Sequence, residues 1–256
     1  MKPLALLDAR AVRFVLLDID DTLTTRGKLG AQAYAALEAL QRGGRKVIPV
    51  TGRPAGWCDH IARMWPVDAV VGENGAFYFW FAEGRLAKRF IDDESTRARQ
   101  RRELQKLAKT ILRQVPGAAL ASDQPYRETD LAIDYCEDVP PLPAEAVERI
   151  VELMRGAGLN AKVSSIHVNG WFGRYDKLAT ARRLLEERFG CDLRGDNRQV
   201  VYAGDSPNDA PMFGYFENSV GVANVRRFAG LRPKYVTEAE AGAGFAELAA
   251  HLLRAQ

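Results

Sequence analysis

A short apolar segment that ends abruptly in aspartates constrains the fold of this chain more than any other feature. Phe14–Leu17 is apolar throughout, and Asp18, Asp20 and Asp21 follow. An apolar run of this length is typical of a buried parallel strand, although a buried helical segment has the same pattern. As the end of a strand, Asp18 and Asp20 would lie where open α/β sheets bind their ligands. The alternative is an Asp-rich turn or helix cap.

Composition excludes several classes of protein. The 256 residues carry a net charge of +3, from 36 basic and 33 acidic side chains, which favours neither nucleic acid nor an anionic membrane as a partner. Cys58, Cys136 and Cys191 are far apart and form no CxxC motif, so they indicate neither a disulfide framework nor a zinc site. No segment has the pattern of a signal peptide or the length of a membrane span. We therefore expect a cytoplasmic protein with reduced thiols.

Strands and helices alternate along the first third of the chain and again along the last third. Such alternation predicts an α/β fold with a parallel sheet. The first part predicts strands at 14–17, 46–50 and 68–71, helices between them, and a hairpin with arms 77–81 and 85–90. The last part predicts a helix at 177–189, strands at 199–203, 219–223 and 234–236, and a final helix to about 253.

Between these parts lies a segment of different composition. It begins with a strongly basic helix over 94–115, whose charges we expect to form a solvated face. With this helix as its first element, the segment has the predicted order αββαββ. A block of this size can form a small domain with its own core. We predict a parallel-sheet core made of residues 1–90 and 173–256, interrupted by an inserted α+β domain at 91–172.

The polar residues that follow the predicted strands suggest a common chemistry. Asp18, Thr51 and Asp205 each come directly after a short apolar strand, so one parallel sheet would bring them to the same edge. Clustered carboxylates repel one another unless a cation lies between them, and hard oxygen donors suit Mg²⁺. Lys177 and the backbone amides at Thr51–Gly52 could bind phosphoryl oxygens. Phosphoryl transfer needs mainly such positioning and charge neutralisation.

Four ordered motifs then carry a resemblance to a known family. DIDDT at 18–22, VTGRP at 50–54, Lys177 within DKLAT, and GDSPND at 204–209 resemble the motifs of the haloacid dehalogenase superfamily. The insertion after the second motif is similar to the branch with Cof-type, sucrose-phosphate and mannosyl-3-phosphoglycerate phosphatases. The resemblance implies a Rossmann-like core and an inserted cap that selects the substrate.

The resemblance also implies roles for individual residues. Asp18 would be the nucleophile that forms an aspartyl-phosphate, and a Mg²⁺ ligand. Asp20 would protonate the leaving alcohol, then activate water, and face the metal with its backbone carbonyl. Thr51 and Lys177 would bind the transferring phosphoryl group. Asp21 stands where the family often has Gly, and we assign it no chemistry.

Further residues complete the predicted site. Asp205 would be the second carboxylate ligand of the metal. Asp209 would act at the metal site through a bound water or Lys177. Asn208 would contact phosphate or the metal, and Gly52 would contact phosphate.

Substrate contacts are harder to assign. Asn74 and His167 are the candidates, together with Asn169 and Arg127. Each has a structural alternative, because Asn74 in a Gly-flanked turn can simply adopt a left-handed backbone and His167 on a strand can simply pack.

We therefore expect a Mg²⁺-dependent phosphatase that hydrolyses a small phosphate monoester, a sugar phosphate or a glycosyl-phosphoglycerate. A phosphomutase would use the same core residues. A phospho-receiver or non-catalytic binding protein is the remaining alternative. The sequence leaves both a monomer and a homodimer open.

Overall fold

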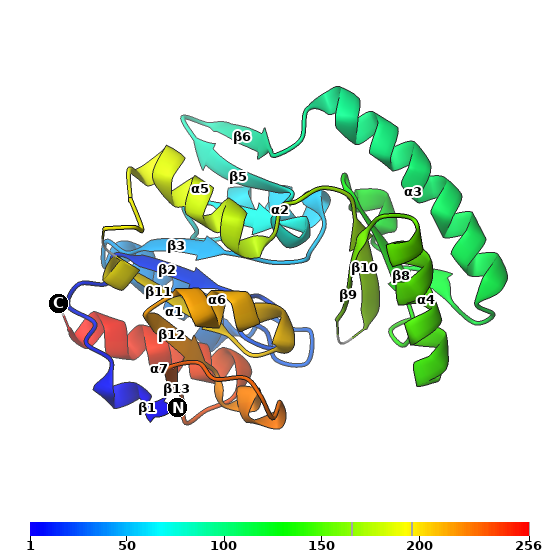
Figure 1. Ribbon diagram of the computed structural model, residues 1–256. Helices are drawn as coiled ribbons and strands as arrows, with labels where there is room; N and C mark the ends of the chain where they lie inside the picture. Colours follow the sequence, from blue (N-terminus) through cyan, green and yellow to red (C-terminus); the bar gives the residue numbers. More distant parts are fainter. Residues whose placement is uncertain (165, 196, 256) are drawn as a thin grey trace. The chain divides into compact units, whose positions relative to one another are not determined.

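The computed structural model describes residues 1–164, 166–195 and 197–255, which form two compact units (Figure 1). The first unit contains residues 1–52, 58–89 and 176–256. The second contains residues 53–57 and 90–175. We call the first unit the core and the second the cap. Position 165, within the expected pair of strands at 160–171, lies outside the described residues.

The core is built on a parallel six-stranded sheet. Its order is β1-β13-β12-β11-β2-β3, and every neighbouring pair is parallel. The strands are, in chain order, Lys2–Pro3, Phe14–Leu17, Lys46–Pro49, Val200–Gly204, Asn218–Gly221 and Tyr235–Val236. The expected α/β class with a parallel-sheet core is confirmed.

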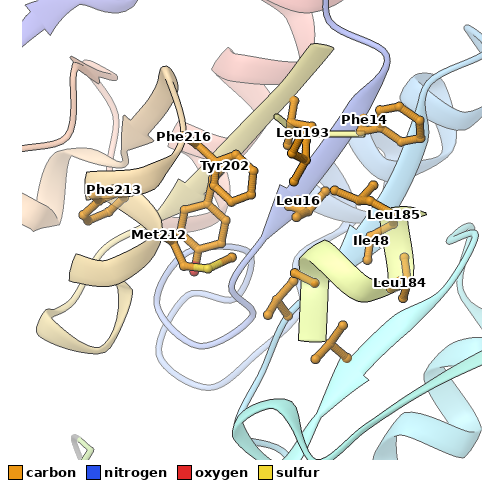
Figure 2. Packing of buried hydrophobic residues seen from close by; sticks show 14 of the residues in the cluster. Phe14, Leu16, Ile48, Leu184, Leu185, Leu193, Tyr202, Met212, Phe213 and Phe216 are labelled. Atoms are coloured by element: carbon orange, nitrogen blue, oxygen red, sulfur yellow. The ribbon is translucent and has the colours of Figure 1, made fainter. Parts of the chain in front are cut away.

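Apolar side chains cover both faces of β2, which pairs with β11 on one side and β3 on the other. All four residues of Phe14–Leu17 are buried, which explains why the segment has no polar alternation. Leu16, with Ile48 and Tyr202 of the adjacent strands, belongs to a cluster that also includes Leu184 and Leu185 of α5 and Met212 and Phe213 of α6 (Figure 2). Each fully buried side chain of this size stabilises the fold by about 1.5–3 kcal/mol.

Five helices in the described residues belong to the core, α2 without its first three residues. They are α1 (Ala31–Arg42), α2 (Ala55–Met64), α5 (Lys177–Phe189), α6 (Ala210–Tyr215) and α7 (Ala241–Arg254). The short α6 was not expected from the sequence. Asp176 caps α5, since its carboxylate accepts a hydrogen bond from the Ala179 N–H at 2.7 Å. This cap determines where the helix begins, and hence where Lys177 is placed. None of the helices in the described residues combines the length and apolar character that a membrane crossing requires.

The strand expected at 68–71 belongs to a different sheet from the one predicted. β4 (Val70–Gly72) pairs antiparallel with β5 (Phe77–Ala82), and β6 (Arg85–Phe90) completes a three-stranded sheet. A single parallel bridge, Val50 to Val71, links this sheet to the end of β3. The tight turn after Gly72 reverses the chain, so β4 finds its main partner in the strand that follows it.

The cap has the expected order of elements. They are α3 (Glu94–Gln114), β7 (Ala119–Leu120), β8 (Asp130–Asp134), α4 (Ala144–Gly156), β9 (Asn160–Val163) and β10 (His167–Trp171). The sheet is antiparallel in the order β7-β8-β10-β9. Leu131, Ile133 and Val168 share an apolar cluster with residues of α3 and α4. The alternate residues of these strands, including Asp130 and Asn169, therefore lie on the opposite face.

A left-handed turn in the core joins two regions that are far apart in sequence. In η2 (Glu73–Gly75) the three φ angles are 42°, 57° and 108°. The Asn74 N–H donates to the Thr51 carbonyl at 3.1 Å, and the Thr180 hydroxyl of α5 donates to the Gly75 carbonyl at 2.5 Å. A Cβ on Gly75 would lie 2.2 Å from the Asp176 carbonyl oxygen. Glycine is therefore required at position 75 by conformation and by space.

We expect Gly75→Ala to destabilise the protein by about 3 kcal/mol or more, because it adds a backbone clash to a left-handed φ. Gly84→Ala is the matched control. Gly84 has φ 71° and no heavy atom within 4 Å of an added Cβ. The control should lose only about 1 kcal/mol. Urea unfolding of both variants measures the difference, and equal losses would contradict the close approach of η2 to α5.

Candidate active site

A buried ion pair lies at the carboxyl end of β2. Asp18 directly follows the strand, and its backbone N–H donates to the Ala203 carbonyl of β11 at 2.9 Å. Lys177 Nζ donates to Asp18 Oδ1 at 2.9 Å and to Asp209 Oδ1 at 3.4 Å. Burial alone would lower the pKa of Lys177, but the two carboxylates outweigh it and raise that pKa. The ammonium therefore stays charged.

Lys177 occupies a position that helix energetics disfavour. It is the first residue of α5, where the partial positive charge of the helix end repels a cation. Its side chain is only 7% exposed, so water does little to offset the charge. The carboxylates of Asp18 and Asp209 supply the compensation. This arrangement indicates a residue kept for the site rather than for the helix.

Asp205 follows β11 and is held by two donors from distant segments. The Thr22 hydroxyl donates to its Oδ1 at 3.1 Å, and Asn224 Nδ2 donates to its Oδ2 at 3.1 Å. Burial, together with the charges of Asp18 and Asp209, raises the pKa of Asp205 to about 8. Burial likewise raises the pKa of Asp18 to about 7, against the opposing effect of Lys177. Negative charge is thus concentrated here beyond what Lys177 neutralises.

The three carboxylates are close enough to share a cation. One oxygen from each of Asp18, Asp205 and Asp209 lies within 4.8 Å of the others, and no His or Cys belongs to this group. Hard oxygen donors of this kind fit Mg²⁺. A divalent ion would also relieve the repulsion that raises the pKa of Asp18 and of Asp205.

Asp209 differs from the other two carboxylates in how its oxygens are used. Its Oδ1 accepts hydrogen bonds from the Tyr202 hydroxyl at 2.5 Å and from Lys177. Its Oδ2 accepts from the backbone N–H groups of Asp205 at 3.0 Å and Ser206 at 3.1 Å. Asp209 is fully buried. Asp209 therefore positions Lys177 and the backbone of Asp205 and Ser206. A direct contact of Asp209 with a metal would compete with these hydrogen bonds.

The two carboxylate oxygens of Asp18 differ in their hydrogen bonds. Its Oδ1 is bonded to Lys177, whereas its Oδ2 accepts no hydrogen bond from the residues that the structure describes. Asp20 is half-buried two residues further on, and its charge helps to raise the pKa of Asp18. The pair thus combines a buried carboxylate, oriented through one oxygen, with a second carboxylate closer to solvent.

The predicted phosphate-binding residues Thr51, Gly52 and Asn208 differ in burial and in what their backbone contacts. Thr51 is buried, and its backbone N–H donates to the Val71 carbonyl at 2.9 Å. The expectation that this amide binds phosphate is therefore wrong, and any contact of Thr51 with phosphate would have to come from its hydroxyl group. Gly52 is half-buried, as is Asn208 in the turn before Asp209.

Asn74 contacts the segment that follows β3. Its backbone is left-handed, as the structural alternative predicts, but its side chain also has a specific location. A Cβ on Gly52 would lie 3.2 Å from Asn74 Oδ1. Asn74 thus packs directly on Gly52, and only a glycine there admits the carboxamide without a shift.

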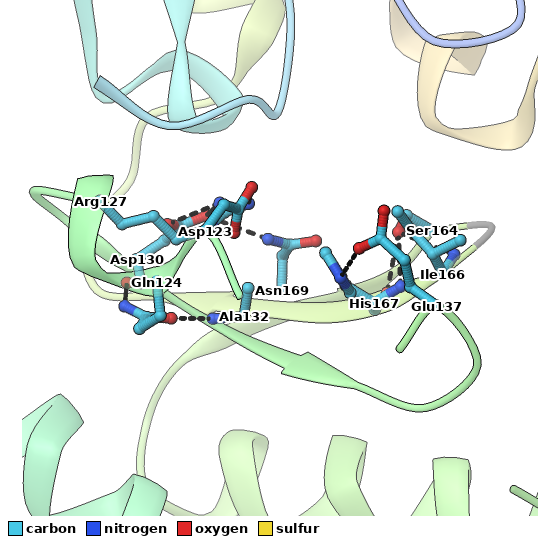
Figure 3. A network of polar contacts seen from close by, with 10 residues as sticks. All are labelled: Asp123, Gln124, Arg127, Asp130, Ala132, Glu137, Ser164, Ile166, His167 and Asn169. Carbon is cyan, nitrogen blue, oxygen red and sulfur yellow. Dashed lines mark hydrogen bonds and ion pairs between the residues drawn. The ribbon is translucent and has the colours of Figure 1, made fainter. Parts of the chain in front are cut away.

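The predicted cap residues lie in polar clusters on one face of the cap sheet (Figure 3). Arg127 forms two hydrogen bonds to each of Asp123 and Asp130, all at 3.0 Å, and its side chain is 2% exposed. Asn169 Nδ2 donates to Asp130 Oδ2 at 3.2 Å. Burial raises the pKa of Asp130, whereas Arg127 opposes this shift. This cluster fastens η3 (Gln124–Tyr126) to β8, so its guanidinium has a structural role.

His167 is engaged at the other end of the same face. Its Nε2 lies 2.8 Å from Glu137 Oε2, and the side chain is 4% exposed. The neighbouring Asp134 carboxylate accepts backbone hydrogen bonds from Cys136, Glu137 and Asp138. Burial would raise the pKa of Asp134, but these bonds outweigh burial and lower it.

Sequence reasoning missed three residues that hold the site together. They are Thr22, Tyr202 and Asn224. Thr22 lies within the first motif. Tyr202 carried a weak signal, as a hydroxyl-bearing residue inside an otherwise aliphatic strand. Asn224 had none, because its contact with Asp205 depends entirely on how the chain returns from β12.

Comparisons with known proteins agree with this arrangement. Residues 15–100 match the family model described as haloacid dehalogenase-like hydrolase. A phosphoglycolate phosphatase from Methanothrix thermoacetophila is 25% identical over 252 residues, covering 94% of this chain and 97% of that protein.

Solved structures share the fold. Protein 0175 of Thermoplasma acidophilum has a TM-score of 0.73 at 19% identity, covering 96% of this chain and 99% of that one. The sucrose-phosphatase of Synechocystis has a TM-score of 0.63 at 19% identity, covering 93% and 97%. The C-terminal domain of trehalose-6-phosphate phosphatase from C. albicans has a TM-score of 0.70 at 13% identity, covering 99% of each chain.

The family match covers the first two motifs, and the buried group formed by Asp18, Lys177, Asp205 and Asp209 accounts for the other two. Over residues 15–100 the chain is thus similar to haloacid dehalogenase-like hydrolases, and its fold is that of the solved structures named above.

Proposed function

We propose that this protein is a Mg²⁺-dependent phosphatase that hydrolyses a small phosphate monoester through an aspartyl-phosphate. The observation that carries the proposal is the environment of Asp18. This carboxylate is oriented by Lys177 through Oδ1, leaves Oδ2 without a donor from the described residues, and lies in a group able to bind a divalent cation. Phosphatase-named relatives and structural neighbours support the same class of reaction.

The chain's own residues divide the reaction into two steps. Asp18 attacks phosphorus while the bond from phosphorus to the leaving oxygen breaks, and Asp20 donates a proton to that oxygen. Asp20 then takes a proton from water as the water oxygen attacks phosphorus, which releases phosphate and restores Asp18. The Thr51 hydroxyl and Lys177 bind the phosphoryl oxygens throughout.

Mg²⁺ would be held by Asp18 and Asp205, with Asp209 orienting the group. When bound, it supplies positive charge that offsets the carboxylates and the phosphoryl oxygens. This role agrees with the donor set and with the raised pKa of Asp205.

Asp18→Asn should abolish phosphate release from p-nitrophenyl phosphate, a loss of at least about 10³-fold, because it removes the nucleophile. Asp21→Asn is the matched control. Asp21 is exposed, has φ 53°, and has no assigned role, so the control should keep nearly full activity. Activity of the native protein should vanish with a chelator and return with Mg²⁺. Persistent turnover by Asp18→Asn would refute the nucleophile assignment.

We further propose a sugar phosphate as the substrate. Two structural neighbours support this proposal, the sucrose-phosphatase of Synechocystis and the trehalose-6-phosphate phosphatase domain of C. albicans, since both are named for a sugar phosphate.

A panel of esters tests the substrate class. Hexose phosphates should give a kcat/KM about tenfold or more above that of phosphoglycolate, because a site that hydrogen-bonds sugar hydroxyls leaves its polar groups unpaired when the smaller ester binds. A preference for phosphoglycolate or a glycosyl-phosphoglycerate would contradict the proposed substrate class. An isomeric sugar phosphate in place of free phosphate would identify a phosphomutase, and no reaction with any ester would favour a receiver or binding protein.

A further inference from the structure

Tyr202 places a hydroxyl group inside the apolar core beneath the active site. The residue lies in the middle of β11 and is fully buried. Its ring packs against Phe213 and Phe216, with centroid distances of 5.8 Å and 6.1 Å (Figure 2). A phenol in such surroundings is costly unless its O–H has a partner. Since phenylalanine would satisfy the packing, the hydroxyl calls for a separate explanation.

The hydroxyl group has a defined partner. It donates to Asp209 Oδ1 at 2.5 Å, the same oxygen that lies 3.4 Å from Lys177 Nζ. The Lys177 ammonium also donates to Asp18 Oδ1, at the shorter distance of 2.9 Å. Lys177 is thus shared unequally between two carboxylates, and the more distant one already accepts a hydrogen bond from Tyr202.

A donor on Asp209 Oδ1 has two physical consequences. It reduces the negative charge that Asp209 presents to Lys177, so the ammonium favours Asp18. It also fixes the rotation of the carboxylate, because the ring that carries the O–H is held by packing. The opposite oxygen is then aimed at the backbone N–H groups of Asp205 and Ser206.

We propose that Tyr202 is a positioning residue that, through Asp209, keeps Lys177 on Asp18 and holds the backbone of Asp205 in place. The inference rests on the proposed function for the roles of Asp18 and Lys177. It adds a residue outside the four motifs to those that support the reaction. Asp209 is then the residue through which Tyr202 acts on Lys177 and Asp205.

Tyr202→Phe removes only the hydroxyl group and tests the proposal. We expect kcat for p-nitrophenyl phosphate to fall about tenfold with KM within about twofold, because Lys177 contributes mainly while the phosphoryl group is transferred. Calorimetric titration with Mg²⁺ alone should show a dissociation constant raised about tenfold, as is typical when the partners behind metal ligands are removed.

Tyr78→Phe is the matched control. Tyr78 is also a buried tyrosine of the same apolar cluster, and its hydroxyl donates to the carboxylate of Glu187, away from the site. This variant loses a hydrogen bond of the same kind, though to a partly exposed carboxylate, so it should be destabilised no more than Tyr202→Phe and should keep native kcat and native Mg²⁺ affinity. Equal effects of the two variants on kcat and on Mg²⁺ binding would overturn the proposal.

A double-mutant cycle tests the relay. In an Asp209→Asn background, Tyr202→Phe should cause little further loss of Mg²⁺ affinity, because Tyr202 acts through Asp209. Fully additive losses would overturn the proposal even if Tyr202→Phe proved hard to purify alone. The Mg²⁺ titration does not depend on turnover. If the native protein hydrolysed no ester, the proposed function would fail while the titrations would still decide the role of Tyr202.

Discussion

The active-site geometry of the core depends on one buried ion pair. In it the ammonium of Lys177 contacts the carboxylates of Asp18 and Asp209. Breaking a buried pair by removing one partner typically costs about 3–5 kcal/mol, since the remaining charge is left uncompensated. Here the group also includes Asp205, so one cation faces three carboxylates. The surrounding fold must therefore hold like charges together, and a divalent ion is the simplest means to neutralise them.

Several features from different parts of the core hold the residues of this ion pair in place. Asp176 begins α5 at the residue before Lys177, and η2 presses Gly75 against the Asp176 carbonyl. The parallel pairing of β2 with β11 brings Asp18 and Asp205 to the same edge of the sheet. Except for the Asp176 cap, these contacts join segments more than 100 residues apart, so the site depends on the sheet register rather than on any one loop.

The sequence predicted those parts of the site that follow from strand ends and from motif order. Asp18, Thr51 and Asp205 were expected at one edge because each follows an apolar strand, and Lys177 because of its place in the motif series. The sequence could not predict contacts between residues that only the tertiary fold brings together. Asn224 reaches Asp205 only after β12, and β4 joins the antiparallel sheet because of the η2 turn. The acceptor of the Thr51 amide, the Val71 carbonyl, belongs to that misplaced strand, so the sequence did not reveal that this amide is already hydrogen-bonded.

The cap contains a second buried acidic cluster, and the contrast with the core separates a structural cluster from a reactive one. Asp130 receives Arg127 on both oxygens and Asn169 on one, so its charge is fully bonded within the cap. Asp18 receives Lys177 on one oxygen, and its other oxygen has no donor from the described part of the chain. Both carboxylates are buried, and burial raises the pKa of each. Burial and a shifted pKa therefore do not by themselves identify a catalytic carboxylate. An oxygen that the protein orients but does not saturate is the better criterion, because that oxygen remains available to bind a metal or attack phosphorus.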